Sequence, residues 1–211
     1  MTQIKICGIT RLEDALVAID LGVGALGFNF YPRSPRYISI RKASYILEKL
    51  PPFVTKIGVV VDFGPAREVR RLAQVLGLNG IQLHGNESSD LARSLKPCLV
   101  LKAFRVTEDF RVTSLQHYPA SAILLDGFVA GKFGGTGKTI DWSLARRASR
   151  FHRIILSGGL TPGNVSEAIR VARPYAVDVA SGVESSPGKK DFRKMRMFVV
   201  SVERADREAH S

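Results

Sequence analysis

The chain has 211 residues, of which 45% are hydrophobic and 24% are charged, and its formal net charge at pH 7 is +12. This length suits one domain with a large buried core, and the composition is ordinary for a globular protein. No apolar run reaches the ~18 residues that a membrane span needs, and the N-terminus lacks the basic-then-apolar order of a signal peptide, so we expect a cytoplasmic protein without a membrane partner.

Short apolar runs alternate with segments of helical periodicity along the chain. The predicted strands are Gln3–Cys7, Ala25–Phe30, Lys56–Val61, Gly80–Leu83, Leu99–Phe104, Ala122–Leu125, Arg153–Leu156 and Ala176–Ala180. The predicted helices are Arg11–Asp20, Arg41–Leu50, Ala66–Leu76, Ser88–Leu95, a short one around Asp109–His117, one beginning near Asp141, Pro162–Val171, and one from about Asp191 toward Arg204. Thr161 before Pro162, and Ser88 before Ser89, have the pattern of helix starts.

These elements make about eight strand–helix units of roughly 26 residues, which favours a single-domain (β/α)8 (TIM) barrel over residues 1–211. The strands are apolar throughout, as parallel strands covered by helices should be. A doubly wound open sheet is the alternative, but eight regular units favour closure. We expect the charged C-terminal tail, from about residue 203, to fray.

Two glycine-rich segments resemble nucleotide-binding motifs but fail on context. Gly22–Gly27 matches GxGxxG, yet it follows a helix and leads into a strand, which is the reverse of a dinucleotide site. Gly134–Thr139 resembles a P-loop, but Lys132 stands where that motif needs glycine. We therefore expect a tight turn at the first segment and a mobile loop at the barrel mouth at the second.

Metal and nucleophile patterns are lacking. The two cysteines and four histidines have no metal-ligand spacing, and no Ser-His-Asp arrangement is visible, so we expect no metal and no cofactor. Cys98 is interpreted as a buried structural thiol, and a disulfide is disfavoured in a cytosolic protein. The positive charge raises nucleic acid as a partner, but the basic residues are scattered, so a small anionic substrate or a basic proteome is the preferred explanation.

In a (β/α)8 barrel the active site is built where the strands end at their C-terminal side. The residues expected there are Cys7, Tyr31, Arg33, Ser34, Arg36, Asp62, His84, Arg105, Asp126, Ser157–Gly159 and Ser181–Gly182. The small, glycine-rich loops after strands seven and eight are at the position where barrels bind phosphate through backbone N–H groups and a helix N-terminus. They predict a phosphorylated ligand.

Cys7 and Asp126 are the candidate catalytic pair. Asp126 ends an apolar strand, where poor solvation favours a carboxyl group that keeps its proton available. An isolated cysteine at a strand end would be interpreted as core packing. With an acid across the mouth and a phosphate site nearby, an acid–base pair becomes the better interpretation of Cys7.

The motifs, taken in order, resemble those of phosphoribosylanthranilate isomerases over nearly the whole chain. They are Lys5–Thr10, Phe28–Phe30 with Ser34–Ile38, Gln82–Gly85, Leu124–Asp126 with Gly134–Lys138 and Asp141-Trp142, Leu156–Leu160 with Asn164-Val165, Asp178–Glu184, and Pro187–Asp191. The chief departure is Asp62, where the family more often has asparagine; this leaves the role of Asp62 open.

The resemblance implies an Amadori rearrangement of N-(5-phosphoribosyl)anthranilate to 1-(2-carboxyphenylamino)-1-deoxyribulose 5-phosphate in tryptophan biosynthesis. It implies that Asp126 protonates the ribose ring oxygen and that Cys7 removes the C2 proton. It also implies that Arg36 pairs with the anthranilate carboxylate. The further substrate-binding residues it implies are His84, Gly158, Gly159, Asp178, Ser181 and Gly182. We expect a monomer or a homodimer.

Two alternatives are weighed against this assignment. The histidine-pathway isomerase performs the same rearrangement on a related barrel, but that family resembles two duplicated halves and has an aspartate base on its first strand, where this chain has Cys7. The second alternative is a barrel without catalytic activity that binds nucleic acid through its positive charge. The combination of Cys7, Asp126 and Arg36 argues against it.

Overall fold

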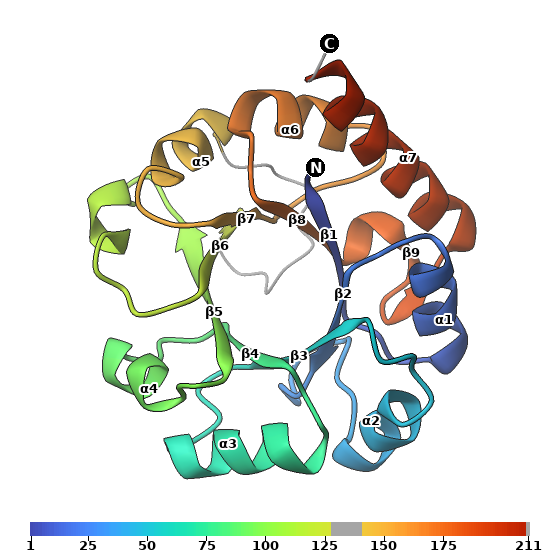
Figure 1. The fold of residues 1–211 in the computed structure, drawn as a ribbon, viewed down its shortest axis with the longest axis vertical. Helices are drawn as coiled ribbons and strands as arrows, with labels where there is room; N and C mark the ends of the chain where they lie inside the picture. The colour runs from blue at the N-terminus through green and yellow to red at the C-terminus, as the bar shows by residue number, and fades with distance from the viewer. Residues whose placement is uncertain (128–140, 210–211) are drawn as a thin grey trace.

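The computed structural model describes residues 1–127 and 141–209, so the expected glycine-rich loop at 134–138 lies outside the described residues. Eight parallel strands form a closed ring in the order β1 to β8, with helices around its outside (Figure 1). β1 pairs with β2 through Lys5 and Ala25 and with β8 through Lys5 and Asp178. This closure confirms the predicted (β/α)8 barrel and excludes the open sheet.

The strands are β1 (Gln3–Cys7), β2 (Ala25–Asn29), β3 (Thr55–Val60), β4 (Gly80–Leu83), β5 (Leu99–Val106), β6 (Ala122–Gly127), β7 (Ile154–Leu156) and β8 (Ala176–Val179). The α-helices are α1 (Leu12–Asp20), α2 (Ile40–Leu47), α3 (Ala66–Val75), α4 (Ser89–Ser94), α5 (Trp142–Ala148), α6 (Val165–Ala172) and α7 (Phe192–Glu208). Two 3₁₀ turns, η1 (Val112–Leu115) and η2 (Ser181–Val183), and a small hairpin of β9 (Glu184–Ser186) and β10 (Lys189–Lys190) complete the described elements.

The core has two layers, because successive strand residues point to opposite faces of the sheet. Residues such as Ile57, Leu101 and Leu124 fill the inside of the ring, and a larger apolar cluster lies between the ring and the helices. The strands are therefore buried on both faces, which explains their apolar sequences.

No helix in residues 1–127 and 141–209 is long and apolar enough to cross a membrane.

Two predicted helices differ from the structure. The segment predicted as a helix around Asp109–His117 is the 3₁₀ turn η1. α6 begins at Val165 rather than at Pro162, because the segment before it forms a turn in which the Thr161 N–H donates to Asn164 Oδ1 at 2.8 Å. Thr161 is therefore not the helix cap that the sequence suggested.

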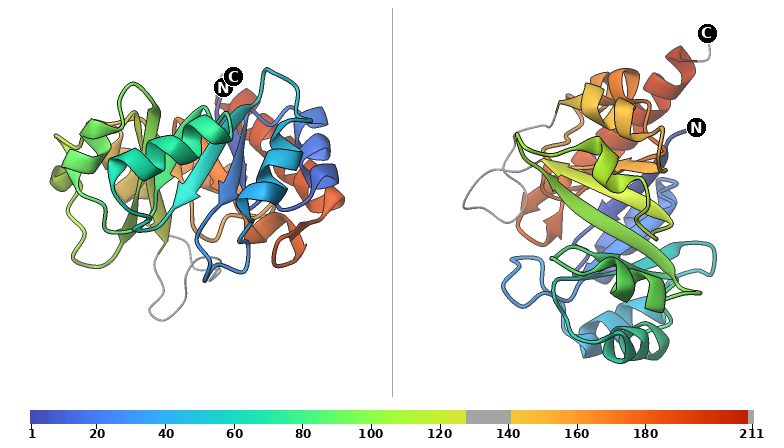
Figure 2. Two further views of the ribbon diagram at one scale, coloured as in Figure 1. Left: turned by 90° about the horizontal axis from the view of Figure 1, so that it is seen from below. Right: turned by 90° about the vertical axis from the view of Figure 1, so that its left-hand side faces the viewer.

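The expected fraying of the chain after Val202 is wrong. α7 continues to Glu208, and both Ala205 and Asp206 are buried. The carboxylate of Asp206 accepts hydrogen bonds from the Thr2 N–H at 2.6 Å and the Thr2 hydroxyl at 2.7 Å. The turn of α7 that holds Asp206 thus lies beside the start of β1, on one side of the barrel (Figure 2).

Several local predictions are confirmed. Ser88 caps α4 by accepting from the Leu91 N–H, and Asp191 caps α7 by accepting from the Lys194 N–H. Gly22 has φ +82° in the turn between α1 and β2, so the GxGxxG segment begins as a turn and its last three residues, from Ala25, belong to β2. Cys98 is free, but it is half-buried rather than buried because it lies just before β5 begins.

Candidate active site

A pocket opens at the C-terminal ends of the strands, with about 890 Å³ of space between its walls and its open mouth. Of the predicted site residues it is lined by Cys7, Arg36, His84, Asp126, Gly158, Gly159, Asp178 and Ser181. Gly182 does not line it. The structure therefore brings both candidate catalytic groups into one cavity, from strands three places apart around the ring (Figure 1).

The thiol of Cys7 lies at the end of β1 in a tight, buried position. A Cβ on Gly27 of the neighbouring strand would lie 2.8 Å from Cys7 Sγ, so glycine is what leaves room for the sulfur. Burial raises the pKa of the Cys7 thiol, and the cations of Lys5 and Lys190 offset only part of this. The resting group is a neutral thiol with two positive charges close to it.

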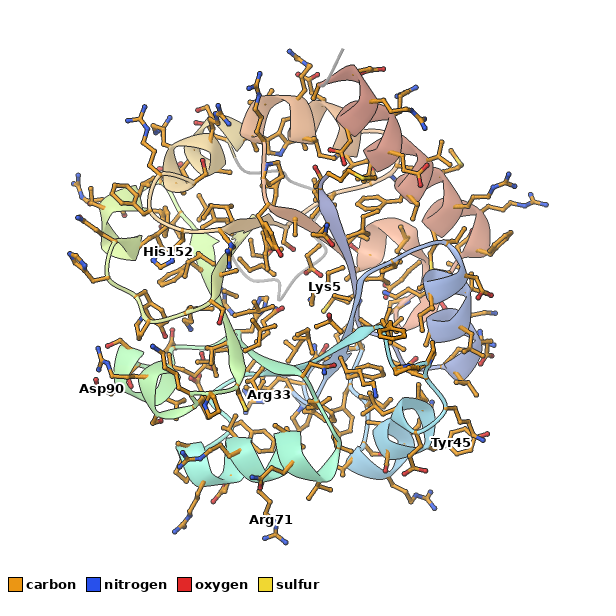
Figure 3. The ribbon with its side chains drawn as sticks, viewed as in Figure 1. Lys5, Arg33, Tyr45, Arg71, Asp90 and His152 are labelled. Atoms are coloured by element: carbon orange, nitrogen blue, oxygen red, sulfur yellow. The ribbon has the colours of Figure 1, made fainter. Side chains whose placement is uncertain are left out.

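Lys5 and Asp178 form an ion pair inside the ring, on the same strands that carry the site. Lys5 Nζ lies 2.7 Å from Asp178 Oδ1, and both side chains are almost completely buried. Figure 3 shows the Lys5 side chain directed into the ring, whereas those of Arg71 and Tyr45 point outward. Burial lowers the pKa of Lys5, but the Asp178 carboxylate and Cys7 outweigh it, so that pKa is raised and Lys5 stays a cation.

Asp126, at the end of β6, lies next to an imidazole. Its Oδ2 is 3.4 Å from His84 Nε2. The other ring nitrogen, His84 Nδ1, is 2.7 Å from the amide nitrogen of Gln82, a fully buried side chain of β4. With the amide nitrogen assigned to this position, Nδ1 accepts its hydrogen, and a neutral His84 then carries its proton on Nε2, facing Asp126.

Arg36, in the loop after β2, is held by a carboxylate that the sequence analysis did not single out. Its Nε donates to Glu184 Oε1 at 2.9 Å and its Nη2 donates to Glu184 Oε2 at 2.7 Å. Lys190 Nζ donates to the same carboxylate at 2.8 Å and to the carbonyl oxygen of Cys7 at 2.6 Å. Burial raises the pKa of Glu184, but Arg36 and Lys190 outweigh this effect and leave that pKa below its ordinary value.

Gly8 allows Arg36 to lie across the end of β1. Its φ is +76°, a conformation that side chains with a Cβ adopt only with strain, and a Cβ there would lie 2.5 Å from Arg36 Cδ. The aliphatic stem of Arg36 therefore rests on the backbone of Gly8 while its head is bound to Glu184. The glycine after the cysteine is a packing requirement of the site.

The loops after β7 and β8 are shaped by glycines that cannot be replaced without overlap. A Cβ on Gly158 would lie 2.2 Å from the Gly127 nitrogen, and one on Gly182 would lie 1.9 Å from the Leu160 oxygen. Within residues 1–127 and 141–209, the backbone N–H groups of Gly159, Ser181 and Gly182 donate to no acceptor. Unused donors gathered in this way suit an anion.

Asp62 lies outside this pocket and helps to shape the loop after β4. Its Oδ1 accepts from the Asn86 N–H at 2.9 Å, and its own N–H donates to Glu87 at 3.0 Å. Glu87 in turn pairs with Lys102 at 2.8 Å, and both of these side chains are buried. The interactions of Asp62 are therefore with the scaffold of the neighbouring loop.

Four residues at the site were given no role in the sequence analysis, although all of them lie within the motifs that carry the family resemblance: Lys5, Gln82, Glu184 and Lys190. Lys5 and Gln82 are polar residues inside apolar strands, at positions that share a face with Cys7 and His84 two residues later, and that spacing is the signal that was available. No such signal marks Glu184 and Lys190, since they belong to a hairpin with no apolar pattern. Among the described residues, no group of three or more His, Cys, Asp or Glu side chains is placed to hold a metal.

Comparison with known proteins gives a consistent result over almost the whole chain. A family model described as N-(5'-phosphoribosyl)anthranilate (PRA) isomerase matches residues 4–201. The N-(5'-phosphoribosyl)anthranilate isomerase of Trichlorobacter lovleyi is 48% identical over 206 residues, which is 97% of this chain and 100% of that relative.

Solved structures agree. The crystal structure of phosphoribosyl anthranilate isomerase from Thermotoga maritima superposes with a TM-score of 0.89 at 45% identity and covers 96% of this chain and 99% of that one. A structure of the isomerase in complex with reduced 1-(o-carboxyphenylamino)-1-deoxyribulose 5-phosphate, which covers 96% of this chain and 99% of its own, superposes with a TM-score of 0.85 at 44% identity. The chain therefore belongs to the N-(5'-phosphoribosyl)anthranilate isomerase family.

Proposed function

We propose that this protein catalyses the Amadori rearrangement of N-(5-phosphoribosyl)anthranilate, with Asp126 as general acid and Cys7 as general base. The observation that carries this assignment is that both groups line one pocket from well-separated strands of the ring. An aldose–ketose rearrangement needs one proton donor and one acceptor on different sides of the sugar. The placement of Cys7 and Asp126 meets that need.

Asp126 gives its proton to the ribose ring oxygen while the C1–O bond breaks, and the nitrogen lone pair forms an iminium at C1. Cys7 first loses its own proton to solvent; the thiolate then takes the proton from C2, and the electron pair of that C–H bond forms the C1–C2 double bond of an enolamine while the iminium nitrogen recovers its lone pair. Protonation at C1 and loss of the enol proton give the ketone. The sum is an isomerisation, in which no electrons are supplied or removed from outside.

The electrostatic surroundings support these roles. A neutral thiol is a poor base, but Lys5 and the ammonium of Lys190 lie close enough to stabilise a thiolate when it forms. The Nε2–H of His84 faces Asp126 Oδ2, so the other carboxyl oxygen is left for the proton that is transferred. His84 therefore acts through Asp126 in this scheme.

The two anionic ends of the substrate have matching donors. Arg36 lines the pocket and is suited to the anthranilate carboxylate, because guanidinium and carboxylate form charge-assisted hydrogen bonds. The N–H groups of Gly159 and Ser181 line the pocket, donate to no acceptor among residues 1–127 and 141–209, and are suited to the phosphate, with the N–H of Gly182 next in the chain. All these residues belong to one chain, so the site is compatible with a monomer or a homodimer.

The assignment is tested by turnover of purified variants. Cys7→Ala and Asp126→Asn should each lower kcat by at least about 100-fold with an unchanged circular dichroism spectrum. Matched controls are Cys98→Ala, at the half-buried second thiol, and Asp109→Asn, at an exposed carboxylate; both should keep normal turnover. Near-normal kcat in either Cys7→Ala or Asp126→Asn would overturn the proposal.

A further inference from the structure

The guanidinium of Arg36 is only partly available to a ligand. Its Nε and Nη2 share one edge of the planar group, and both donate to the Glu184 carboxylate. Nη1 has no acceptor in the part of the chain that the structure describes. Since Arg36 lines the pocket, a carboxylate that binds there has to use the remaining edge, which contains Nη1 and the second hydrogen of Nη2.

Glu184 is fully engaged and is unsuited to proton transfer. Its Oε1 accepts from Arg36 Nε, Lys190 Nζ and the Gly188 N–H, and its Oε2 accepts from Arg36 Nη2. Its side chain is 4% exposed, so water does not compete for these oxygens. The group is fixed in place as a carboxylate, which makes it an anchor for Arg36.

Lys190 connects Glu184 to the end of β1, the strand that carries Cys7. Its three ammonium hydrogens have three acceptors: Glu184 Oε1 at 2.8 Å, the Cys7 carbonyl oxygen at 2.6 Å and the Ala180 carbonyl oxygen at 3.2 Å. The antiparallel pairing of β10 with β9 places Lys190 opposite Glu184. One hairpin therefore joins the ends of β1 and β8 to the loop that carries Arg36.

The charges of the cluster match a singly charged anion. Burial lowers the pKa of Lys190, but its three acceptors, one of them the Glu184 carboxylate, favour the ammonium form. With Arg36 and Lys190 as cations and Glu184 as a carboxylate, the three groups carry one net positive charge. A carboxylate bound to the free edge of Arg36 brings the sum to zero, whereas an uncharged ring substituent leaves a buried positive charge uncompensated. Discrimination for the carboxylate is thus a property of the whole cluster.

We propose that Glu184, anchored by Lys190, is a positioning residue that sets the selectivity for a substrate carboxylate by holding the Nε–Nη2 edge of Arg36 and leaving the Nη1 edge to the ligand. This inference rests on the proposed function, from which it takes the contact between Arg36 and the anthranilate carboxylate. It adds a residue that touches no substrate atom and decides which substrate is accepted.

The test compares two ligands that differ only in the carboxyl group: reduced 1-(o-carboxyphenylamino)-1-deoxyribulose 5-phosphate and its phenylamino counterpart. Calorimetry gives the ratio of the two Kd values for each enzyme. In the unmodified protein the carboxylated ligand should bind about 10- to 100-fold more tightly, as expected for charge-assisted hydrogen bonds. In Glu184→Gln an amide NH₂ opposes the Arg36 donors, so the guanidinium is no longer held in place, and the ratio should fall about tenfold even though the cluster gains a positive charge.

Glu184→Asp is the second variant, in case the amide prevents folding. It keeps the charge, but the shorter side chain cannot hold both Arg36 nitrogens, so the ratio should again fall. The control is Glu167→Gln, which breaks an exposed pair with Arg170 on α6 and should leave the ratio unchanged. A residue with only a structural role would lower the melting temperature without changing the ratio, and that result would overturn the inference.

Arg36→Met separates this inference from the proposed function. If Arg36→Met abolishes the selectivity while the Glu184 variants keep it, the carboxylate contact stands and the role of Glu184 is wrong. If Arg36→Met keeps the selectivity of the unmodified protein, the contact itself is wrong, and the proposed substrate orientation fails with it.

Discussion

Lys5 Nζ lies 2.7 Å from Asp178 Oδ1 inside the barrel, on the strand that ends two residues later at Cys7. Asp178 was predicted to bind substrate, and it does line the pocket, but one of its oxygens is already committed to Lys5. The pair is a charged element in an apolar interior, and neither side chain is more than 6% exposed. Removing one partner leaves the other as an uncompensated buried charge.

Lys5→Met should therefore lower the free energy of unfolding by about 3–5 kcal/mol, measured by urea denaturation. Adding Asp178→Asn to that variant should recover part of the loss, because the unpaired charge is then gone. Lys42→Met, at an exposed position of α2, is the control and should change little. A Lys5→Met protein as stable as the parent would show that the pair is not what holds Asp178 in place.

The thiol of Cys7 should ionise later than an ordinary cysteine, because burial raises its pKa. Alkylation by iodoacetamide requires the thiolate, so its rate at Cys7, followed by mass spectrometry, should keep rising with pH beyond about 8.5, the value for a free thiol. The same thiol in the urea-unfolded chain is the reference and should show the lower midpoint. A native midpoint at or below the reference would contradict the raised pKa.

The raised pKa of Cys7 also makes the stability of the protein depend on pH. Because the folded-state pKa is raised, the unfolded chain loses the Cys7 proton first as the pH increases. The stabilisation is therefore complete below about pH 8.5 and is lost as the pH rises toward the folded-state value. Cys7→Ser should lack this part of the alkaline decline, measured as the difference in unfolding free energy between pH 7.5 and pH 10.

Gly8→Ala should weaken substrate binding through Arg36. The new methyl group meets Arg36 Cδ, so the side chain has to leave its place, and KM should rise. Gly22→Ala is a closely matched control, since Gly22 also has a positive φ, but a Cβ there meets no atom within 4 Å. Both variants should lose about 1–2 kcal/mol of stability from backbone strain, and only Gly8→Ala should change KM.

Gln82→Leu should lower kcat more than it changes KM. Loss of the amide donor frees His84 to take the other tautomer, which removes the Nε2–H that faces Asp126. A decrease in kcat of about tenfold or more is expected, since it is part of what general acid catalysis contributes. Gln74→Leu, at an exposed position of α3, is the control. An unchanged kcat in Gln82→Leu would show that His84 needs no such orientation.

Asp206→Ala should destabilise the protein, although it lies in a segment that the sequence suggested would fray. The variant leaves the Thr2 N–H and hydroxyl without their charged acceptor, and about 1.5–3 kcal/mol of unfolding free energy should be lost. Glu203→Ala, an exposed residue one turn earlier in α7, should be neutral. If the two variants were equally stable, the contact between Asp206 and Thr2 would not be what stabilises the end of α7.

The elements of this fold were largely readable from the sequence because their causes are local. Apolar strands and helical periodicity depend on residues a few positions apart, and eight such units in succession predicted the barrel. The places where prediction failed are those where a distant partner decides: α7 extends to Glu208 because Asp206 meets Thr2, and α6 starts late because Asn164 binds the Thr161 N–H.

In the active site, too, some features follow from the local sequence and others depend on distant residues. By itself the sequence determined that Cys7 and Asp126 end their strands, since parallel strands all end on one side of a barrel. Only the tertiary structure decided which charged groups surround them. Lys5 and Asp178 are 173 residues apart in the chain, and Arg36 and Glu184 are 148 apart. Such pairs follow from strand register and barrel closure, which bring distant residues together, and no local pattern of residues encodes them.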